Sequence, residues 1–164
     1  MSLSPAIATA VADVRQKLVA LEQDISGVST TDAVGYIIHT QAALPYWVNA
    51  FTSVRVRKIA TDLWHIDTTV RAIYHGWQLT EGQSGEAEQE AQVALFAYAA
   101  AFAERRELNS DTYPAGTIAL VADMSDDPGA ISAEIVTQPG GASEHLCVAI
   151  TLQLTLEVFL EEGY

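Results

Sequence analysis

The sequence HLCVAITLQLTLEVFLEEGY, His145–Tyr164, has an apolar residue at every second position from Leu146 to Leu160. Alternation with a period of two is the pattern of a β-strand that buries one face. At about 3.3 Å per residue, a strand from Leu146 to Glu161 would span roughly 50 Å. Most strands have only about five or six residues. A strand of this length is therefore expected to cross its own core and then to reach another surface.

An amphipathic helix is predicted near the other end of the sequence. Ser4 is a suitable N-cap, and Pro5 suits the first helical position. The apolar residues that follow are spaced alternately by four and three, which places them on one face of a helix. They are Ile7, Val11, Val14, Leu18, Leu21 and Ile25. Gly27 predicts the end of this helix, and the apolar stripe is expected to pack on a sheet.

A strand and a hairpin are predicted in the next part of the chain. Leu44–Phe51 is expected to form the strand. Val54–Ile59 alternates apolar and basic residues, and Leu63–Trp77 alternates apolar and polar ones, which is typical of a hairpin with one buried face. The buried face of the second hairpin strand is predicted to hold Trp64, Ile66, Thr68, Val70, Ala72 and Tyr74. Val34–His39 is compatible with a further short strand.

A second helix is predicted to begin at Ser84, with Arg105 and Arg106 near its end. Its apolar stripe would be Ala91, Leu95, Tyr98 and Phe102. The strands Thr117–Ala122 and Ile131–Thr137 come next, before the long terminal strand. This order predicts an α+β fold of one domain, residues 1–164, in which a largely antiparallel or mixed β-sheet carries two amphipathic helices on one face.

The composition excludes some classes of protein. The chain has 164 residues and a formal net charge of −13, whereas a nucleic-acid-binding protein is usually basic. The longest uncharged apolar run, Ala91–Ala103, is shorter than the roughly 20 residues of a transmembrane helix. The first ten residues lack the positive region of a secretory signal. A protein made in a cytoplasm, with no membrane partner, is therefore expected.

No catalytic motif is present, and no catalytic, cofactor-binding or metal-binding residue is predicted. His65, Asp67 and His75 share one strand pattern, but a solvated strand face is favoured over a metal site there. Cys147 is the single cysteine, and it is predicted to be a small buried residue. Alanine at Cys147, or at any one histidine, is expected to leave assembly intact.

The predicted hairpin holds an unusual concentration of positive charge. Arg55, Arg57 and Lys58 are three of only eight lysine and arginine residues in the chain. A solvated hairpin face is the simpler interpretation. The functional interpretation is a contact with an acidic surface on a neighbouring copy or partner.

Three segments in this order of elements carry a resemblance to a known family. They are LPYWVNAF (44–51), VRAIYHGW (70–77) and LCVAITLQLTLEVFLEE (146–162). In size, element order and terminal strand the chain resembles the tail terminator proteins of long-tailed bacteriophages. The resemblance implies a virion protein, assembled in the host cytoplasm, that forms a six-fold ring. The ring would cap the tail tube protein, meet the head connector protein and conduct DNA through a channel without binding it specifically.

The same resemblance implies where subunits or partners would meet. The second half of the terminal strand, Leu156–Tyr164, would reach the interface or rim of the ring. Six copies at −13 each would carry about −78, which would let DNA slide if enough of the charge faced the channel. The predicted interface residues are Arg55, Arg57, Lys58, Glu157, Phe159 and Glu161.

Two alternatives remain open from the sequence. One is a small pocket protein, an enzyme or ligand carrier similar to the NTF2-like group. Its pocket would be lined by Trp47, Trp64, Tyr74, Trp77 and Phe102. The other is a different phage neck or head-completion subunit, which shares the ring but meets the portal.

Overall fold

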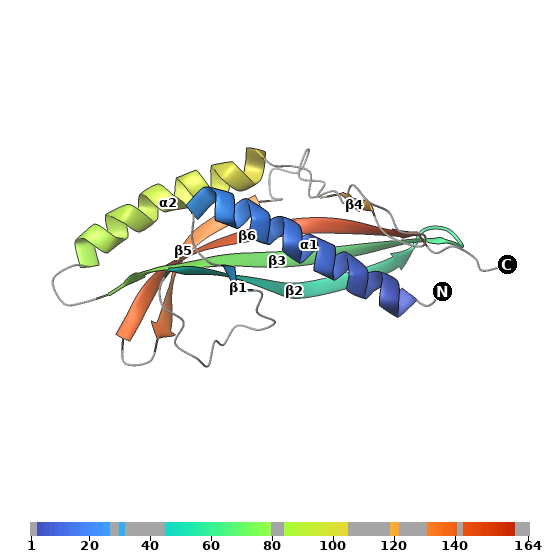
Figure 1. Cartoon of the computed structure of the whole chain (residues 1–164), viewed down its shortest axis with the longest axis horizontal. Helices are drawn as coiled ribbons and strands as arrows, with labels where there is room; N and C mark the ends of the chain where they lie inside the picture. Colours follow the sequence, from blue (N-terminus) through green and yellow to red (C-terminus); the bar gives the residue numbers. More distant parts are fainter. Residues whose placement is uncertain are drawn as a thin grey trace.

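The computed structural model describes residues 3–26, 30–31, 45–79, 84–104, 119–121, 131–140 and 143–159. Two helices lie on one face of a single sheet, so the α+β prediction is confirmed (Figure 1). The helices are α1 (Leu3–Ser26) and α2 (Ser84–Glu104). The strands are β1 (Thr30–Thr31), β2 (Tyr46–Lys58), β3 (Leu63–Gln78), β4 (Ala119–Val121), β5 (Ile131–Gly140) and β6 (Ser143–Phe159).

The sheet is built around the terminal strand β6. The strand order is β1-β2-β3-β6-β4, with β5 also paired to β6, and only the β1–β2 pair is parallel. On one side β6 pairs with β3 from Leu63↔Phe159 to Gln78↔His145. Its other side is shared by two strands, with β5 along its first half and β4 near its end. The length of β6 is thus explained by three neighbours within its own chain.

The burial of β6 corrects one expectation. The residues at every second position from Leu146 to Val158 are buried on the face that the helices cover. Leu156 is 1% exposed and Val158 0%. The prediction that the strand leaves its own core at Leu156 is therefore wrong for this face as far as Val158, because β3 runs beside it over the same length.

Strand β2 is longer than predicted. Leu44–Phe51 and Val54–Ile59 were expected to be separate strands, but one strand runs from Tyr46 to Lys58. Its pairing with β3 shifts between Phe51 and Ser53, where a β-bulge inserts one residue. A bulge places two residues opposite one and so breaks the period-two pattern. The break in the sequence pattern is therefore a change of register within a continuous strand.

The aromatic side chains pack between the helices and the sheet. Trp47 of β2 is fully buried, and its ring centroid lies 5.1 Å from that of Tyr74, 5.3 Å from that of Tyr98 and 6.0 Å from that of Phe102. Such tilted contacts are favourable beyond the area they bury. Trp47, Tyr74 and Phe102, which the NTF2-like alternative expected to line a pocket, are therefore part of the core.

Helix α1 buries the predicted stripe, with Val14, Leu18 and Leu21 in the core. The same face also buries a polar link to the sheet. Asn49 Nδ2 of β2 donates a hydrogen bond to Glu22 Oε2 at 3.0 Å, and both residues are fully buried. A buried polar contact of this kind fixes the position of the helix, since any shift would leave a desolvated group unpaired.

Candidate functional site

The outer half of β2 is an open edge within the described part of the chain. β1 pairs only with Trp47 and Val48, so beyond them β3 is the one described neighbour of β2. All residues from Thr52 to Lys58 are exposed. The turn to β3 is closed by backbone hydrogen bonds from Ile59 and Ala60 to the Leu63 carbonyl. An open edge of this kind presents backbone groups that another chain can pair with.

The open edge carries apolar side chains on the face that the helices cover elsewhere. Val54 and Val56 pair in register with Thr68 and Ile66, which are buried. Val54 is nevertheless 63% exposed and Val56 44%, and Ile59 in the turn is 50% exposed. The apolar face of the sheet therefore continues to its edge without being covered there.

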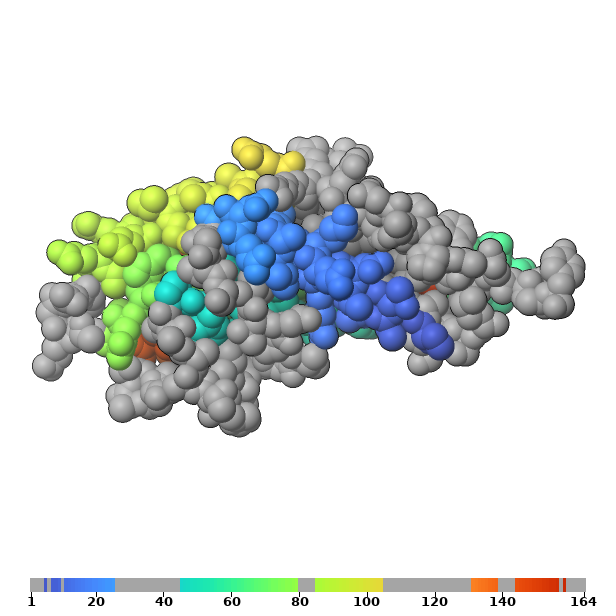
Figure 2. Space-filling model, viewed as in Figure 1, coloured from blue at the N-terminus to red at the C-terminus, as the bar shows by residue number. Residues whose placement is uncertain are grey.

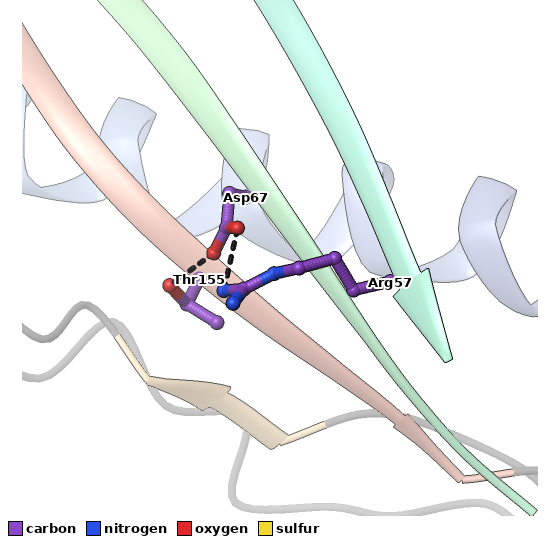
Figure 3. Close-up of polar contacts among 3 residues, drawn as sticks. All are labelled: Arg57, Asp67 and Thr155. Carbon is purple, nitrogen blue, oxygen red and sulfur yellow. Dashed lines mark hydrogen bonds and ion pairs between the residues drawn. The ribbon is translucent and has the colours of Figure 1, made fainter. Parts of the chain in front are cut away.

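The opposite face of the edge carries the predicted arginines. Arg57 Nη2 lies 2.7 Å from Asp67 Oδ2, and Thr155 Oγ1 donates to Asp67 Oδ1 at 2.9 Å (Figure 3). The three side chains come from β2, β3 and β6, so the contact ties three adjacent strands together. Lys58 lies on the other face, with Val54 and Val56, and its Nζ lies 5.5 Å from the centroid of the Trp64 ring, a cation–π contact. Arg57 and Lys58 thus have partners within the chain, while remaining exposed.

The structure brings two of the predicted interface segments to the same end of the sheet. Arg57 pairs in register with His65, and His65 pairs with Glu157. Phe159 pairs with Leu63 beside the turn. The side chains of Glu157 and Phe159, and the whole of Glu161, lie outside the described residues.

A second exposed apolar surface lies on α2. Val93 is 72% exposed and Phe96 77%, and the exposed Ala97 and Ala100 continue the same side of the helix. An open depression of about 360 Å³ borders this surface; it is lined by Gln89, Glu90, Val93, Ala94 and Tyr98. We call Val93, Phe96, Ala97 and Ala100 the α2 outer face.

The beginning of α2 and the β2–β3 turn lie at opposite ends of the molecule, and the α2 outer face runs from the middle of this helix toward its second half. The turn lies at the right end of the long axis and the first half of α2 at the left end (Figure 1). The space-filling view shows the same separation, with α2 in yellow-green at one end and the turn in green at the other (Figure 2). Glu86 and Glu88 are exposed at the beginning of α2. The turn end therefore carries cations beside apolar residues, while α2 begins with carboxylates and carries its exposed apolar residues in later turns.

The α2 outer face was not predicted from the sequence. The expected apolar stripe was Ala91, Leu95, Tyr98 and Phe102, of which Ala91 and Phe102 are buried, as predicted. The many alanines of α2 make each side of the helix apolar. The available signal was that Val93 and Phe96 are large and fall outside the predicted stripe.

A buried cluster of metal-ligand side chains lies on the face of the sheet away from the helices, at the end of β3 that is opposite the β2–β3 turn. His75 of β3 pairs in register with Cys147 of β6, and His145 lies two residues before Cys147. His75 Nδ1 is 2.9 Å from His145 Nε2 and 3.3 Å from Cys147 Sγ. The Tyr46 ring stacks on the His75 ring, with 4.6 Å between the centroids. All four residues are buried.

Burial sets the protonation state of this cluster. It lowers the pKa of His75 to about 4, with the neighbouring His145 as a smaller cause. It also lowers the pKa of His145. The pKa of Cys147 is raised to about 12 because desolvation disfavours the thiolate. At neutral pH the cluster therefore holds two neutral imidazoles and a thiol.

The cluster was not predicted from the sequence, although the burial of Cys147 was predicted and is confirmed. The side chains that the sequence pattern grouped on one strand face were His65, Asp67 and His75. Asp67 is instead paired with Arg57 and Thr155. The signal that was available was His145 and Cys147 at positions i and i+2, which places both on one face of a strand.

Comparison with known proteins gives no assignment. No family model matches the chain, and no curated protein matches it. Among the described residues, no helix is long and apolar enough to cross a membrane.

Proposed function

We propose that this chain is a structural subunit of a ring, with the role of a phage tail terminator that caps the tail tube and joins it to the head connector. The observation that carries the proposal is a pair of separate exposed surfaces on the molecule. The β2 edge combines Val54 and Val56 with Arg55 and Lys58. The α2 outer face follows the exposed Glu86 and Glu88 on the same helix.

Two different, complementary surfaces favour head-to-tail association of identical copies. A ring results from such heterologous contacts when the rotation between neighbours closes. The positive edge of one copy would meet the acidic helix of the next, and the exposed apolar residues of both would be covered. Basic residues on a strand edge also discourage uncontrolled pairing. The same side chains therefore suit an edge that pairs only with a charge-matched partner.

The terminator role adds the partners and the channel. It rests on the similarity of element order and size given above, since the same ring could serve another neck or head-completion protein. A net charge of −13 per copy suits a ring through which DNA passes without adhering. The NTF2-like alternative receives less support, because Trp47, Tyr74 and Phe102 fill the core.

The test is the assembly state of the purified chain, alone and with purified tail tubes, measured by light scattering and negative-stain imaging. We expect rings of six copies, free or at tube ends, and tubes that stop growing when the protein is added. Monomers at every concentration, together with tubes whose growth is unaffected, would refute the proposal.

A matched pair of variants tests the surface. Arg55→Gln with Lys58→Gln removes two positive charges from the edge, and Gln16→Glu with Gln23→Glu changes the net charge equally on the exposed side of α1. We expect at least about a tenfold weaker assembly for the first pair, since two interface charges are typically worth more than about 1.4 kcal/mol together. The control pair should assemble as the parent does. Equal effects would show that only the overall charge matters.

A further inference from the structure

We propose that His75, His145 and Cys147 form a binding site for a zinc-like divalent ion. The ion would join β3 to β6 at the end of the sheet that is opposite the β2–β3 turn. The site is independent of the proposed ring. It lies on the opposite face of the sheet from the helices. The proposal rests on three side chains with metal-binding atoms that converge from two strands. All three atoms lie within 4.8 Å of one another.

The placement of the ligands follows from strand geometry. His145 and Cys147 are separated by one residue on β6 and therefore point to the same face. His75 comes from the neighbouring strand, directly opposite Cys147. Residues i and i+2 of one strand with a cross-strand partner form a triangle of side chains that needs no loop to close it. The ligands are held by the backbone hydrogen bonds of a central strand pair.

The distances are close to those of a tetrahedral site. Zinc lies about 2.0–2.1 Å from histidine nitrogen and about 2.3 Å from cysteine sulfur, so two nitrogens of one tetrahedron are roughly 3.3 Å apart and a nitrogen and a sulfur roughly 3.6 Å. The corresponding separations here are 2.9 Å between His75 Nδ1 and His145 Nε2, and 3.3 Å between His75 Nδ1 and Cys147 Sγ. Side-chain rotations that widen each separation by a few tenths of an ångström would admit the ion.

The hydrogen bonds of the cluster meet at one atom. His75 Nδ1 carries either one hydrogen or one lone pair. With a hydrogen it can donate to His145 Nε2 and to Cys147 Sγ, and with a lone pair it can accept from either neighbour. A metal ion would instead take a lone pair from all three atoms at once.

The ligand set selects the class of ion. Two imidazoles and a thiolate suit zinc and similar transition metals, whereas magnesium and calcium prefer oxygen ligands. Histidine binds metal as the neutral imidazole and cysteine as the thiolate, so the Cys147 proton would pass to solvent when the ion binds. The Tyr46 ring, stacked on His75, restrains the orientation of that ligand. These three residues leave the fourth position of a tetrahedron for water.

The test uses the full chain without a histidine tag, stripped of metal with a chelator and then titrated with Zn²⁺ against a chromophoric competitor. We expect one ion per chain, together with a higher melting temperature. With Co²⁺ in place of Zn²⁺, we expect an absorption spectrum of tetrahedral form with a sulfur-to-cobalt charge-transfer band. This spectrum tests the ligands in the parent protein and requires no variant to fold.

Variants then identify the ligands. Cys147→Ser keeps the size of the side chain and should abolish the charge-transfer band and weaken zinc binding at least about tenfold. His65→Ala, on the same face of β3 but at its other end, is the matched control and should bind as the parent does. Absence of stoichiometric binding, or a Cys147→Ser protein that binds zinc and shows the band unchanged, would overturn the proposal.

Discussion

Replacement of Leu156 by alanine tests whether the second half of β6 belongs to the core of its own chain. Leu156 is 1% exposed, faces the helices and pairs in register with Ile66 of β3. The substitution removes three buried carbon groups, which at roughly 0.8 kcal/mol each amounts to about 2.4 kcal/mol. The cavity left behind adds to this, so we expect a loss of about 3–4 kcal/mol in the free energy of unfolding.

The assay is denaturant unfolding followed by circular dichroism, at several protein concentrations low enough to keep the chain unassembled. For a chain of this length the melting temperature should fall by roughly 10 °C. Val54→Ala is the control, because Val54 is 63% exposed in the single chain and should change stability by less than about 0.5 kcal/mol. A cost below 1 kcal/mol for Leu156→Ala, or a cost that arises only when the protein assembles, would refute the reasoning and restore the interface interpretation of this segment.

Three further outcomes are expected. Asn49→Ala should lower the free energy of unfolding by about 2 kcal/mol, measured with denaturant, because it removes the hydrogen bond from Asn49 Nδ2 to the buried Glu22 carboxyl; a change under 1 kcal/mol would show that this hydrogen bond adds little to stability. Burial, and to a smaller extent the neighbouring Tyr74, raises the pKa of Tyr98 well above its usual 10. The unfolded chain therefore loses this proton first, so denaturant unfolding should show stability falling as the pH rises above 10, and falling less in Tyr98→Phe. Phe96→Ser should leave the melting temperature within about 2 °C, because Phe96 is 77% exposed, but should weaken ring assembly in light scattering; normal assembly would exclude the α2 outer face from the contact.

The parts of the fold that were predictable are those with an uninterrupted period. The period-two alternation from Leu146 to Val158 and from Trp64 to Tyr74 predicts two long strands with one buried face, and the structure has both. The stripe of α1 was equally readable. The prediction was wrong at Phe51, where a bulge shifts the alternation by one residue. A register shift within one strand and the end of a strand give the same local sequence pattern.

The candidate sites were less predictable for a different reason. The basic edge was predictable because Arg55, Arg57 and Lys58 lie within four consecutive positions of the sequence. The histidine–cysteine cluster depends on the pairing of His75 with Cys147, which are 72 positions apart and meet only once the register of β3 and β6 is fixed. Periodicity determines which face a residue occupies, but not which residue of the next strand lies opposite.

The two proposed sites can be separated by one comparison, because they lie at opposite ends of β3. His65 pairs with Arg57 at the open edge and His75 belongs to the buried cluster; these two residues are ten positions apart, which is roughly 33 Å of strand. Effects at sites this far apart are normally additive. Cys147→Ser should therefore lower the melting temperature of the zinc-loaded protein and leave assembly unchanged. The Arg55→Gln and Lys58→Gln pair should weaken assembly and leave the melting temperature of the zinc-loaded protein unchanged. The combined variant should show the sum of both effects. Loss of ring assembly in Cys147→Ser at an unchanged melting temperature would mean that the buried cluster takes part in the subunit contact, and the structural separation of the two sites would then be incorrect.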